Sequence, residues 1–256
     1  MITSSSNEKI KNLAGLIAKG RERRESGTYV VEGIKQVLEA EYEDMVACYV
    51  SDELDREALQ SISVRFRDKV EMVRDNVIDK VSDTRTPQGV IAIVKMRKHT
   101  IEEITEGERP FIVMLDRISD PGNMGTIIRT AEGAGVSGII AGEGCVDIYN
   151  PKTVRSTMGS LYRVPVVTGA DLEEAVSCLK EKGIKLIATH LDGRHSYFDE
   201  DMTGPCAVII GSEAHGISDA LAEAADSLIR IPMAGKLESR NASVAAALMM
   251  YEAARQ

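Results

Sequence analysis

The stretch from Ile229 to Tyr251 reads IRIPMAGKLESRNASVAAALMMY, and it contains an apolar run, a loop and a helix in that order. The apolar run ends at Pro232, because proline has no backbone N–H to donate within a sheet. Ser239, Asn241 and Ser243 gather where the helix begins, and short polar side chains at that place cap free backbone N–H groups. The stretch therefore predicts a strand, a glycine-containing loop and a capped helix.

The helix expected over Ala242–Arg255 is apolar on nearly every side. Its Val244, Leu248 and Tyr251 fall on one face, since positions three and four apart are neighbours on a helix. The other faces carry mostly alanine and methionine. A helix without a polar face has to be covered all round. We therefore expect its own sheet to cover one side and a second subunit to cover the other.

Two earlier stretches have the same order of strand, polar turn and helix. Residues 208–218 read VIIGSEAHGIS, a strand that runs into a Gly-x-Glu-x-x-Gly loop. Residues 115–135 read LDRISDPGNMGTIIRTAEGAG, in which a turn with proline and glycine separates a strand from a helix. In open parallel sheets, ligands bind outside the carboxyl ends of the strands, so we expect the three turns to contribute to one site.

Apolar runs of strand length alternate with helical segments over residues 110–256. This alternation predicts an α/β domain with an open, mostly parallel sheet and helices on both faces. Strands are expected at 111–115, 138–141, 163–167, 185–189, 206–210 and 227–231, and helices at 124–134, 152–158, 172–182, 218–225 and 242–255.

A smaller α/β domain is expected over residues 1–98, where strands and helices also alternate. It begins with a helix over 6–24 whose lysines and arginines lie opposite its apolar positions. Residues 99–109 are polar and charged, so we place a linker there. Further strands are expected near 27–33, 45–50, 70–73 and 89–94, with helices near 34–40, 55–62 and 76–81.

The composition disfavours several classes of protein. No apolar run reaches the length of a membrane span, and the first residues lack the apolar core of a signal peptide. The cysteines have no paired spacing, so we expect reduced thiols in a cytoplasmic protein. The formal net charge of -9 disfavours nucleic acid as a partner only weakly, because binding depends on local basic patches.

Two motifs of other chemistries do not fit this chain. Residues 133–138 match the Gly-x-Gly-x-x-Gly dinucleotide fingerprint, but a helix precedes them and a strand follows, which is the reverse of the required order. We expect a helix end there instead, with a glycine in the left-handed conformation. His190, His195 and Asp199 have no familiar zinc spacing, so no metal is expected.

The three turns, in this order and spacing, resemble the three motifs of the SpoU (TrmH) family of RNA ribose 2′-O-methyltransferases, in the SPOUT superfamily. The resemblance covers about 111–255. It implies S-adenosyl-L-methionine as cofactor, a homodimer, and a trefoil knot in the C-terminal domain, which is rare among folds. Tyr29-Val-Val-Glu-Gly and Thr86-Pro-Gln-Gly-Val resemble the L30e-like substrate-binding domain that many SpoU enzymes carry in front.

The resemblance also implies roles for individual residues. Arg129 matches the family's catalytic arginine, and because a guanidinium stays protonated and only donates, we expect it to stabilise the developing alkoxide or to hold a phosphate. Glu213 is expected to orient Arg129. The other polar positions of the motifs complete the expected catalytic set, Asn123, Ser239 and Asn241. The cofactor is expected to contact Thr189, Gly211, Gly216, Ile231, Met233 and Arg240, the last of which stands where the family usually has leucine.

The expected substrate is RNA, and ribosomal RNA is favoured by analogy with the family's front domain. The basic side chains of the leading helix are expected to bind it, namely Lys9, Lys11, Lys19, Arg21, Arg23 and Arg24. Two alternatives remain open, which are transfer RNA as the substrate and an RNA-binding protein of the same fold without catalysis. A small-molecule α/β enzyme is disfavoured, because no nucleotide fingerprint fits.

Overall fold

Short β-branched runs form the strands of two separate sheets in the computed structural model, which describes residues 1–191, 193–233 and 241–256. Each sheet lies in its own unit. The first unit comprises Met1–Arg97 and Tyr149–Tyr162, and the second comprises Lys98–Ile148 and Arg163–Gln256. This grouping differs from the sequence division, because residues 149–162 belong with the first unit and residues 99–109 with the second.

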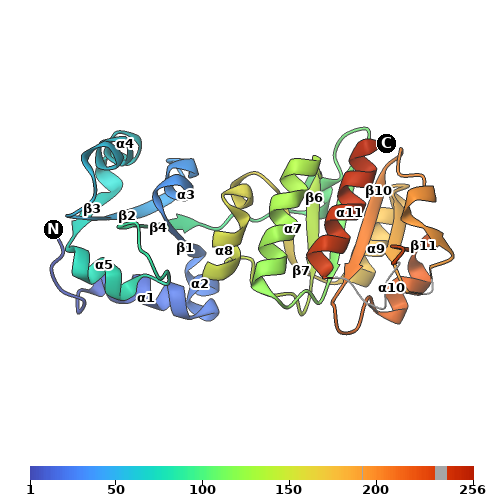
Figure 1. The fold of residues 1–256 in the computed structure, drawn as a ribbon, viewed down its shortest axis with the longest axis horizontal. Helices are drawn as coiled ribbons and strands as arrows, with labels where there is room; N and C mark the ends of the chain where they lie inside the picture. Colours follow the sequence, from blue (N-terminus) through green and yellow to red (C-terminus); the bar gives the residue numbers. More distant parts are fainter. Residues whose placement is uncertain (192, 234–240) are drawn as a thin grey trace. The chain divides into compact units, whose positions relative to one another are not determined.

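The first unit is built on a sheet with the strand order β1-β4-β2-β3 (Figure 1). β4 is antiparallel to both β1 and β2, whereas β3 runs parallel to β2. Its elements are α1 (Glu8–Ala18), α2 (Gly20–Ser26), β1 (Thr28–Glu32), α3 (Ile34–Glu39), β2 (Met45–Ser51), α4 (Arg56–Phe66), β3 (Val70–Val73), α5 (Asp75–Val81), β4 (Val90–Lys95) and α8 (Pro151–Thr157).

Helices cover both faces of the first sheet. α1 buries Ile10 and Leu13 against one face, because positions three apart fall on one side of a helix. On the other face α8 packs through Val154, and the ring of Tyr149 lies 4.7 Å from that of Tyr29 between centroids. The segment 149–162 therefore completes a core that residues 1–97 begin.

The second unit is built on a parallel sheet with the order β7-β6-β5-β10-β8-β11-β9 in the described residues. Every neighbouring pair of these strands is parallel. Its elements are α6 (Ile101–Ile104), β5 (Phe111–Asp116), α7 (Pro121–Ala134), β6 (Gly138–Gly142), β7 (Val166–Ala170), α9 (Leu172–Glu181), β8 (Lys185–Thr189), β9 (His195–Ser196), β10 (Cys206–Gly211), α10 (Asp219–Ala224), β11 (Ser227–Arg230) and α11 (Ala242–Arg255).

Helices lie on both faces of the parallel sheet, as the sequence predicts. α9 and α10 bury Leu179 and Leu221 in one core with Met114 and Ile209 of the central strands. α7 and α11 pack on each other on the opposite face (Figure 1). Buried on both sides, the central strands are almost continuously apolar, which is typical of parallel sheets.

Most expected elements lie within a few residues of their predicted ends. The helix expected over 6–24 is two helices, because Lys19 is extended between them. The strand expected at 163–167 begins only after Pro165, which has no N–H to pair with a neighbouring strand. The short strand β9 was not predicted, since two residues carry no periodicity. In the part of the chain that the structure describes, no helix is long and apolar enough to cross a membrane.

Candidate functional site at the carboxyl edge of the parallel sheet

The carboxyl ends of neighbouring strands meet at one edge of the parallel sheet. Asp116, the last residue of β5, is in register with Gly211, the last residue of β10. Thr189 ends the next strand, β8, and pairs with Ile229 of β11. The register therefore brings the turns after these strands to one edge, where open α/β sheets bind their ligands.

The turn after β10 folds back on itself between Gly211 and Gly216. A Cβ atom on Gly211 would lie 2.0 Å from the carbonyl carbon of Gly216, so no side chain fits there. Gly216 has a φ of 66°, which glycine adopts without strain. The need for glycine at position 211 therefore arises within the turn itself.

The first turn of α7 is fixed by a capping pair that the sequence makes recognisable. Asp120 is the N-cap residue, and its carboxylate accepts a hydrogen bond from the backbone N–H of Asn123 at 2.8 Å. Pro121 follows at the first helical position, where its fixed φ suits a helix and its missing N–H costs nothing. This start holds Asn123 at the edge of the sheet.

Side chains from three turns form one hydrogen-bonded network at this edge. The amide nitrogen of Asn123 donates to a carboxylate oxygen of Glu213, which also accepts from the backbone N–H of Ala242 at 3.1 Å. The amide nitrogen of Asn241 donates to the side-chain oxygen of Asn123 at 2.9 Å. The network therefore joins the starts of α7 and α11 to the turn after β10. Three of the five expected catalytic residues meet here.

Asn241 also caps α11. Its side-chain oxygen accepts from the backbone N–H of Ser243 at 2.9 Å and from the hydroxyl of the same serine at 2.6 Å. This arrangement confirms the capped helix that the sequence predicts, with Asn241 as the cap. Ser239, the first of the three expected polar residues, lies outside the described residues.

The residues expected to hold the cofactor end two neighbouring strands. The hydroxyl of Thr189 donates to the backbone oxygen of Ile209 at 3.2 Å, and Ile231 and Met233 are half-buried just beyond β11. A hydroxyl, strand-end backbone groups and apolar side chains suit the adenosyl part of S-adenosylmethionine, which offers polar ring edges and an apolar face. The described residues therefore fit this cofactor. Arg240 lies outside them.

Arg129 stands apart from the network. It is exposed on α7, and in the described residues neither a hydrogen bond nor an ion pair joins it to Glu213. Glu213 is instead engaged by Asn123 and by the first N–H of α11. The expected orientation of Arg129 by Glu213 is thus not made within this chain, and the guanidinium is open to an incoming group.

The basic side chains of the leading helices are mostly neutralised by acidic neighbours. Arg23 is buried, and its guanidinium donates to the backbone oxygen of Leu16 at 2.7 Å near the end of α1. Arg24 is exposed, and no acid within the described ranges pairs with it. The other four cations form ion pairs with N–O distances of 2.6 or 2.7 Å, Lys9 with Glu71, Lys11 with Glu8, Lys19 with Glu22 and Arg21 with Glu25.

The sequence argument gave no role to Asp116, although it ends β5 within the first motif. Its carboxylate is buried and accepts from the backbone N–H of Ser218 at 2.8 Å. It thereby fixes the start of α10 next to the candidate site. A charged residue at the end of an otherwise apolar strand was the available signal.

His195 takes part in a separate cluster and not in a metal site. Its Nε2 lies 2.6 Å from a carboxylate oxygen of Glu200, which also accepts from Ser227 at 2.6 Å. Lys185 pairs with the other oxygen of Glu200 at 2.6 Å. Within residues 1–191, 193–233 and 241–256, no group of His, Cys, Asp and Glu is arranged to hold a metal ion.

Comparison with family models identifies both parts of the chain. Residues 110–251 match the model of the SpoU rRNA Methylase family, which covers the three turns and the network between them. The chain belongs to the SpoU rRNA Methylase family. Residues 7–92 match the model of an MRM3-like substrate binding domain.

Relatives of known name share the whole length of the chain. The 23S rRNA (guanosine(2553)-2′-O)-methyltransferase RlmP of Bacillus subtilis is 32% identical, over 98% of this chain and 97% of its own. The AdoMet-bound rRNA methyltransferase from Sinorhizobium meliloti has a TM-score of 0.88 and 32% identity, covering 99% of this chain and 97% of its own. The SpoU methyltransferase AviRb from Streptomyces viridochromogenes, in complex with AdoMet, has a TM-score of 0.88 and 30% identity, covering 98% of each chain.

Proposed function

We propose that this protein methylates a ribose 2′-hydroxyl in ribosomal RNA, with S-adenosyl-L-methionine as methyl donor. The observation that carries the proposal is the network of Asn123, Glu213 and Asn241, which gathers the three SpoU motifs at the carboxyl edge of the parallel sheet. The choice of ribosomal RNA is supported by the name of the B. subtilis relative, which matches both units along nearly their whole length.

The methyl donor would be held at the ends of β8, β10 and β11. Thr189, Gly211 and Ile231 lie on these neighbouring strands or just beyond them, and Gly216 and Met233 follow them along the chain. Arg240 is proposed to contact the donor as well, and it lies outside the described residues. When bound there, S-adenosylmethionine would supply the methyl group from its sulfonium to the ribose 2′-oxygen and would leave as S-adenosylhomocysteine. The role of this edge is to hold the two reactants in line, which is a large part of catalysis in such transfers.

As the new oxygen–carbon bond forms, the proton of the ribose hydroxyl passes to solvent water. Arg129 does not remove it, because a guanidinium offers only hydrogen-bond donors and no acceptor for a proton. Arg129 instead donates to the oxygen as negative charge develops on it, or clamps the neighbouring phosphate. Its exposed side chain suits either role, since it is held by no acid in the described residues.

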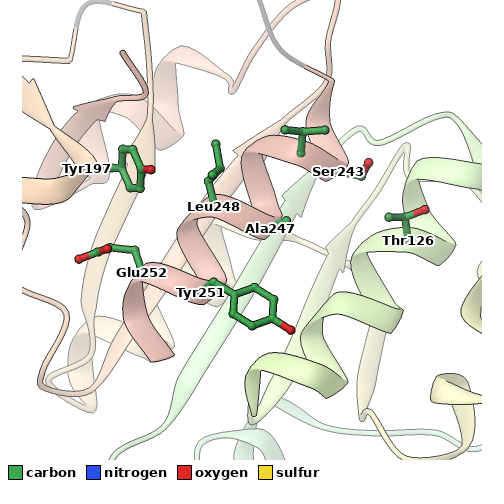
Figure 2. Close-up of a pocket in the computed structure, with 8 residues that line it drawn as sticks. Thr126, Tyr197, Ser243, Ala247, Leu248, Tyr251 and Glu252 are labelled. Atoms are coloured by element: carbon green, nitrogen blue, oxygen red, sulfur yellow. The ribbon is translucent and has the colours of Figure 1, made fainter. Parts of the chain in front are cut away.

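A homodimer is supported by an uncovered apolar face on α11. Val244 is 46% exposed and Tyr251 is 55% exposed, although both are apolar or aromatic. With Leu248 they line a groove of about 440 Å³, which Figure 2 shows between Tyr197 and Thr126 of α7. An exposed apolar groove of this kind marks a contact surface. We propose that a second copy of the chain covers it.

The groove and the catalytic arginine share one surface, since Thr126 and Arg129 are one turn apart on α7. We infer that Arg129 works beside the subunit contact. A Val244→Glu variant should sediment at the mass of one chain, while the unaltered protein sediments at twice that mass. A monomeric unaltered protein would refute the dimer.

The first unit is proposed to bind the RNA outside the methylated nucleotide, as its MRM3-like family model implies by name. Arg24 is the natural contact among the six expected cations, because its charge is not paired within the described ranges. The four ion-paired cations, Lys9, Lys11, Lys19 and Arg21, contribute where a phosphate displaces an exposed acid. Arg23 supports the end of α1 instead. We also propose the trefoil knot of the SPOUT fold and a cytoplasmic location, where ribosomal RNA is found.

An Arg129→Ala variant tests the proposed activity. Methyl transfer to 23S rRNA should fall by about 100-fold or more, the loss expected on removal of one donor to a developing oxyanion. Binding of S-adenosylmethionine, measured by calorimetry, should be unchanged. Transfer at the normal rate by this variant would remove Arg129 from the mechanism. An unaltered protein that binds the cofactor but methylates neither ribosomal nor transfer RNA would refute the enzyme.

A further inference from the structure

Arg117 carries a backbone conformation that its residue type disfavours. Its φ is 56°, in the left-handed region that non-glycine residues rarely adopt. The other non-glycine residues with positive φ in the described ranges are Arg67 and Met158, which both follow the last residue of a helix. Met158 has the left-handed conformation that is ordinary at a helix end, whereas Arg67, with a ψ of -113°, does not. Arg117 instead follows a buried strand, and strain at such a place clusters at functional sites.

The unusual backbone lets Arg117 fold back on its own neighbour. Successive side chains of an extended strand point to opposite faces, so adjacent residues do not normally pair. Here the Nε and one Nη atom of Arg117 donate to the two carboxylate oxygens of Asp116, at 2.9 and 3.0 Å. Asp116 is almost fully buried, whereas the side chain of Arg117 remains 45% exposed. The carboxylate therefore binds one edge of the guanidinium, and the other edge of the guanidinium stays accessible.

Two further contacts hold this pair in place. The carboxylate of Asp116 is itself fixed by the backbone N–H of Ser218, at the start of α10. A Cβ atom on Gly144 would lie only 3.2 Å from Cγ of Arg117, so the stem of the arginine lies against the chain at position 144. A guanidinium fixed at both stem and carboxylate loses little conformational entropy when it binds an anion.

The outer edge of this guanidinium points to an anionic ligand at the candidate site. Two N–H groups on its second Nη atom and one on the first are not used by the carboxylate, since arginine has five donors. Asp116 is in register with Gly211, so Arg117 lies at the strand edge where the methyl acceptor has to arrive. The carboxylate of Asp116 already accepts hydrogen bonds from Ser218 and from Arg117.

We propose that Arg117 binds a backbone phosphate of the substrate RNA beside the methylated nucleotide. It is an RNA-positioning residue distinct from Arg129, and the proposal rests on the RNA substrate proposed above. An arginine presents paired donors to phosphate oxygens. The strained backbone of Arg117 allows its pairing with Asp116, and that pairing orients the remaining donors. The carboxylate of the methyl donor is the other anion at this edge, and the experiment separates the two.

The test compares Arg117→Gln with Arg163→Gln in the full-length protein. Arg163 is the matched control, because it is 46% exposed, is paired with Glu132 and lies before β7, at the opposite edge of the sheet. Binding of unmodified 23S rRNA transcript is measured at salt concentrations from about 50 to about 200 mM, over which the affinity due to phosphate contacts falls strongly. Cofactor affinity is measured separately by calorimetry.

Arg117→Gln should weaken RNA binding by about fivefold to tenfold. It should also reduce by about one the magnitude of the slope of log binding constant against log salt concentration, whereas Arg163→Gln should change neither quantity. The KM for RNA should rise, while kcat should stay within about threefold of its value in the unaltered protein. Cofactor affinity should be unchanged. RNA binding equal to that of the control overturns the proposal. Weaker cofactor binding with unchanged RNA binding also overturns it and assigns Arg117 to the donor's carboxylate.

An Arg117→Gly variant separates binding from folding. Glycine relieves the left-handed backbone, which offsets part of the stability lost with the Asp116 pair, so the variant should stay folded at the assay temperature while RNA affinity still falls. A lower melting temperature with normal RNA affinity would make Arg117 a structural residue only. Because RNA binding is measured apart from methyl transfer, a failure of this proposal can be told from a failure of the proposed activity.

Discussion

Two carboxylates organise the two ends of the same parallel sheet, and they do so differently. Glu200, at the amino-terminal ends of the strands, accepts from Lys185, His195 and Ser227, and its side chain is only 4% exposed. Glu213, at the carboxyl ends, accepts from Asn123 and Ala242, with no cation beside it in the described residues. The first cluster is closed and balanced in charge, as a structural support should be. The second is half-buried, and within the described residues it is held by neutral donors.

The difference shows which polar cluster a ligand can use. Lys185, His195 and Ser227 already donate to Glu200, so an incoming group would have to displace these partners at a cost. Glu213 joins three turns through neutral donors in the described residues. We propose that its remaining lone pairs are available to the cationic methyl donor or to an arginine in the RNA-bound state. Substitutions of Glu213 and Glu200 test this difference between the two clusters.

The largest effect is expected for Glu213→Ala. Without the carboxylate, Asn123 and the first N–H of α11 lose their common acceptor, so the three turns are no longer held together. Methyl transfer should fall by at least about 100-fold, since displacements of about 1 Å cost that much. Unfolding in urea should show a loss of about 2 kcal/mol, because two hydrogen bonds worth about 1 kcal/mol each are lost. A loss of stability large enough to explain the lost activity would contradict the assignment.

Glu200→Ala should give the opposite result. Removing the carboxylate leaves Lys185 and His195 without their acceptor, although both are partly exposed and can turn to water. The free energy of unfolding should fall by about 2 kcal/mol, since hydrogen bonds to charged groups are worth about that much. Transfer rates measured on folded protein should change by less than about twofold, because the cluster lies at the far edge of the sheet. Equal losses of activity in the two variants would remove the contrast.

The stability contribution of Glu200 should depend on pH. Burial alone would raise the pKa of its carboxyl group, but the hydrogen bonds from Lys185, Ser227 and His195 outweigh burial and hold the pKa below the ordinary value of 4.5. A lowered pKa in the folded state stabilises the protein at pH values above 4.5, and this contribution disappears as the pH falls through the folded-state pKa.

Urea titrations should therefore show a gap between the unaltered protein and Glu200→Gln at pH 7 that narrows on acidification below pH 4.5. A gap that widens on acidification would mean that the pKa is raised and not lowered.

The smallest effect is expected for helix caps, and it separates a cap at the site from one away from it. Asn241→Ala removes the cap of α11. Asp171→Ala removes the cap of α9, where the carboxylate of Asp171 accepts from the backbone N–H groups of Glu173 and Glu174. Each should lower stability by about 1 kcal/mol. Only Asn241→Ala should also lower methyl transfer, because Asn241 donates to Asn123. Equal activity in both variants would show that the network does not serve catalysis.

The sequence predicted the elements well because their signals are local. Each strand is indicated by its own run of β-branched residues. The starts of α7 and α11 are indicated by Asp120 with Pro121 and by the polar residues around Asn241. The division into units was less visible, because the packing of Val154 and Tyr149 on the first sheet is a contact between distant parts of the chain. Local patterns carry no information about such contacts.

The candidate site was predicted in its residue types but not in its connections. The motifs pointed to Asn123, Glu213 and Asn241, yet the bond from Glu213 to the N–H of Ala242 depends on the register of distant strands. The ion pairs that neutralise Lys9 and Arg21 were also missed, because a count of basic residues ignores the acids placed beside them by the fold.

The most direct test of the account is to map ribose methylation in 23S rRNA after incubation with the purified protein and S-adenosylmethionine. We expect one nucleotide to gain a 2′-O-methyl group with the unaltered protein and with Glu200→Gln, and none at a comparable rate with Glu213→Ala. If no ribose is methylated, or if Glu213→Ala methylates as fast as the unaltered protein, the carboxyl edge of the sheet is not the catalytic site.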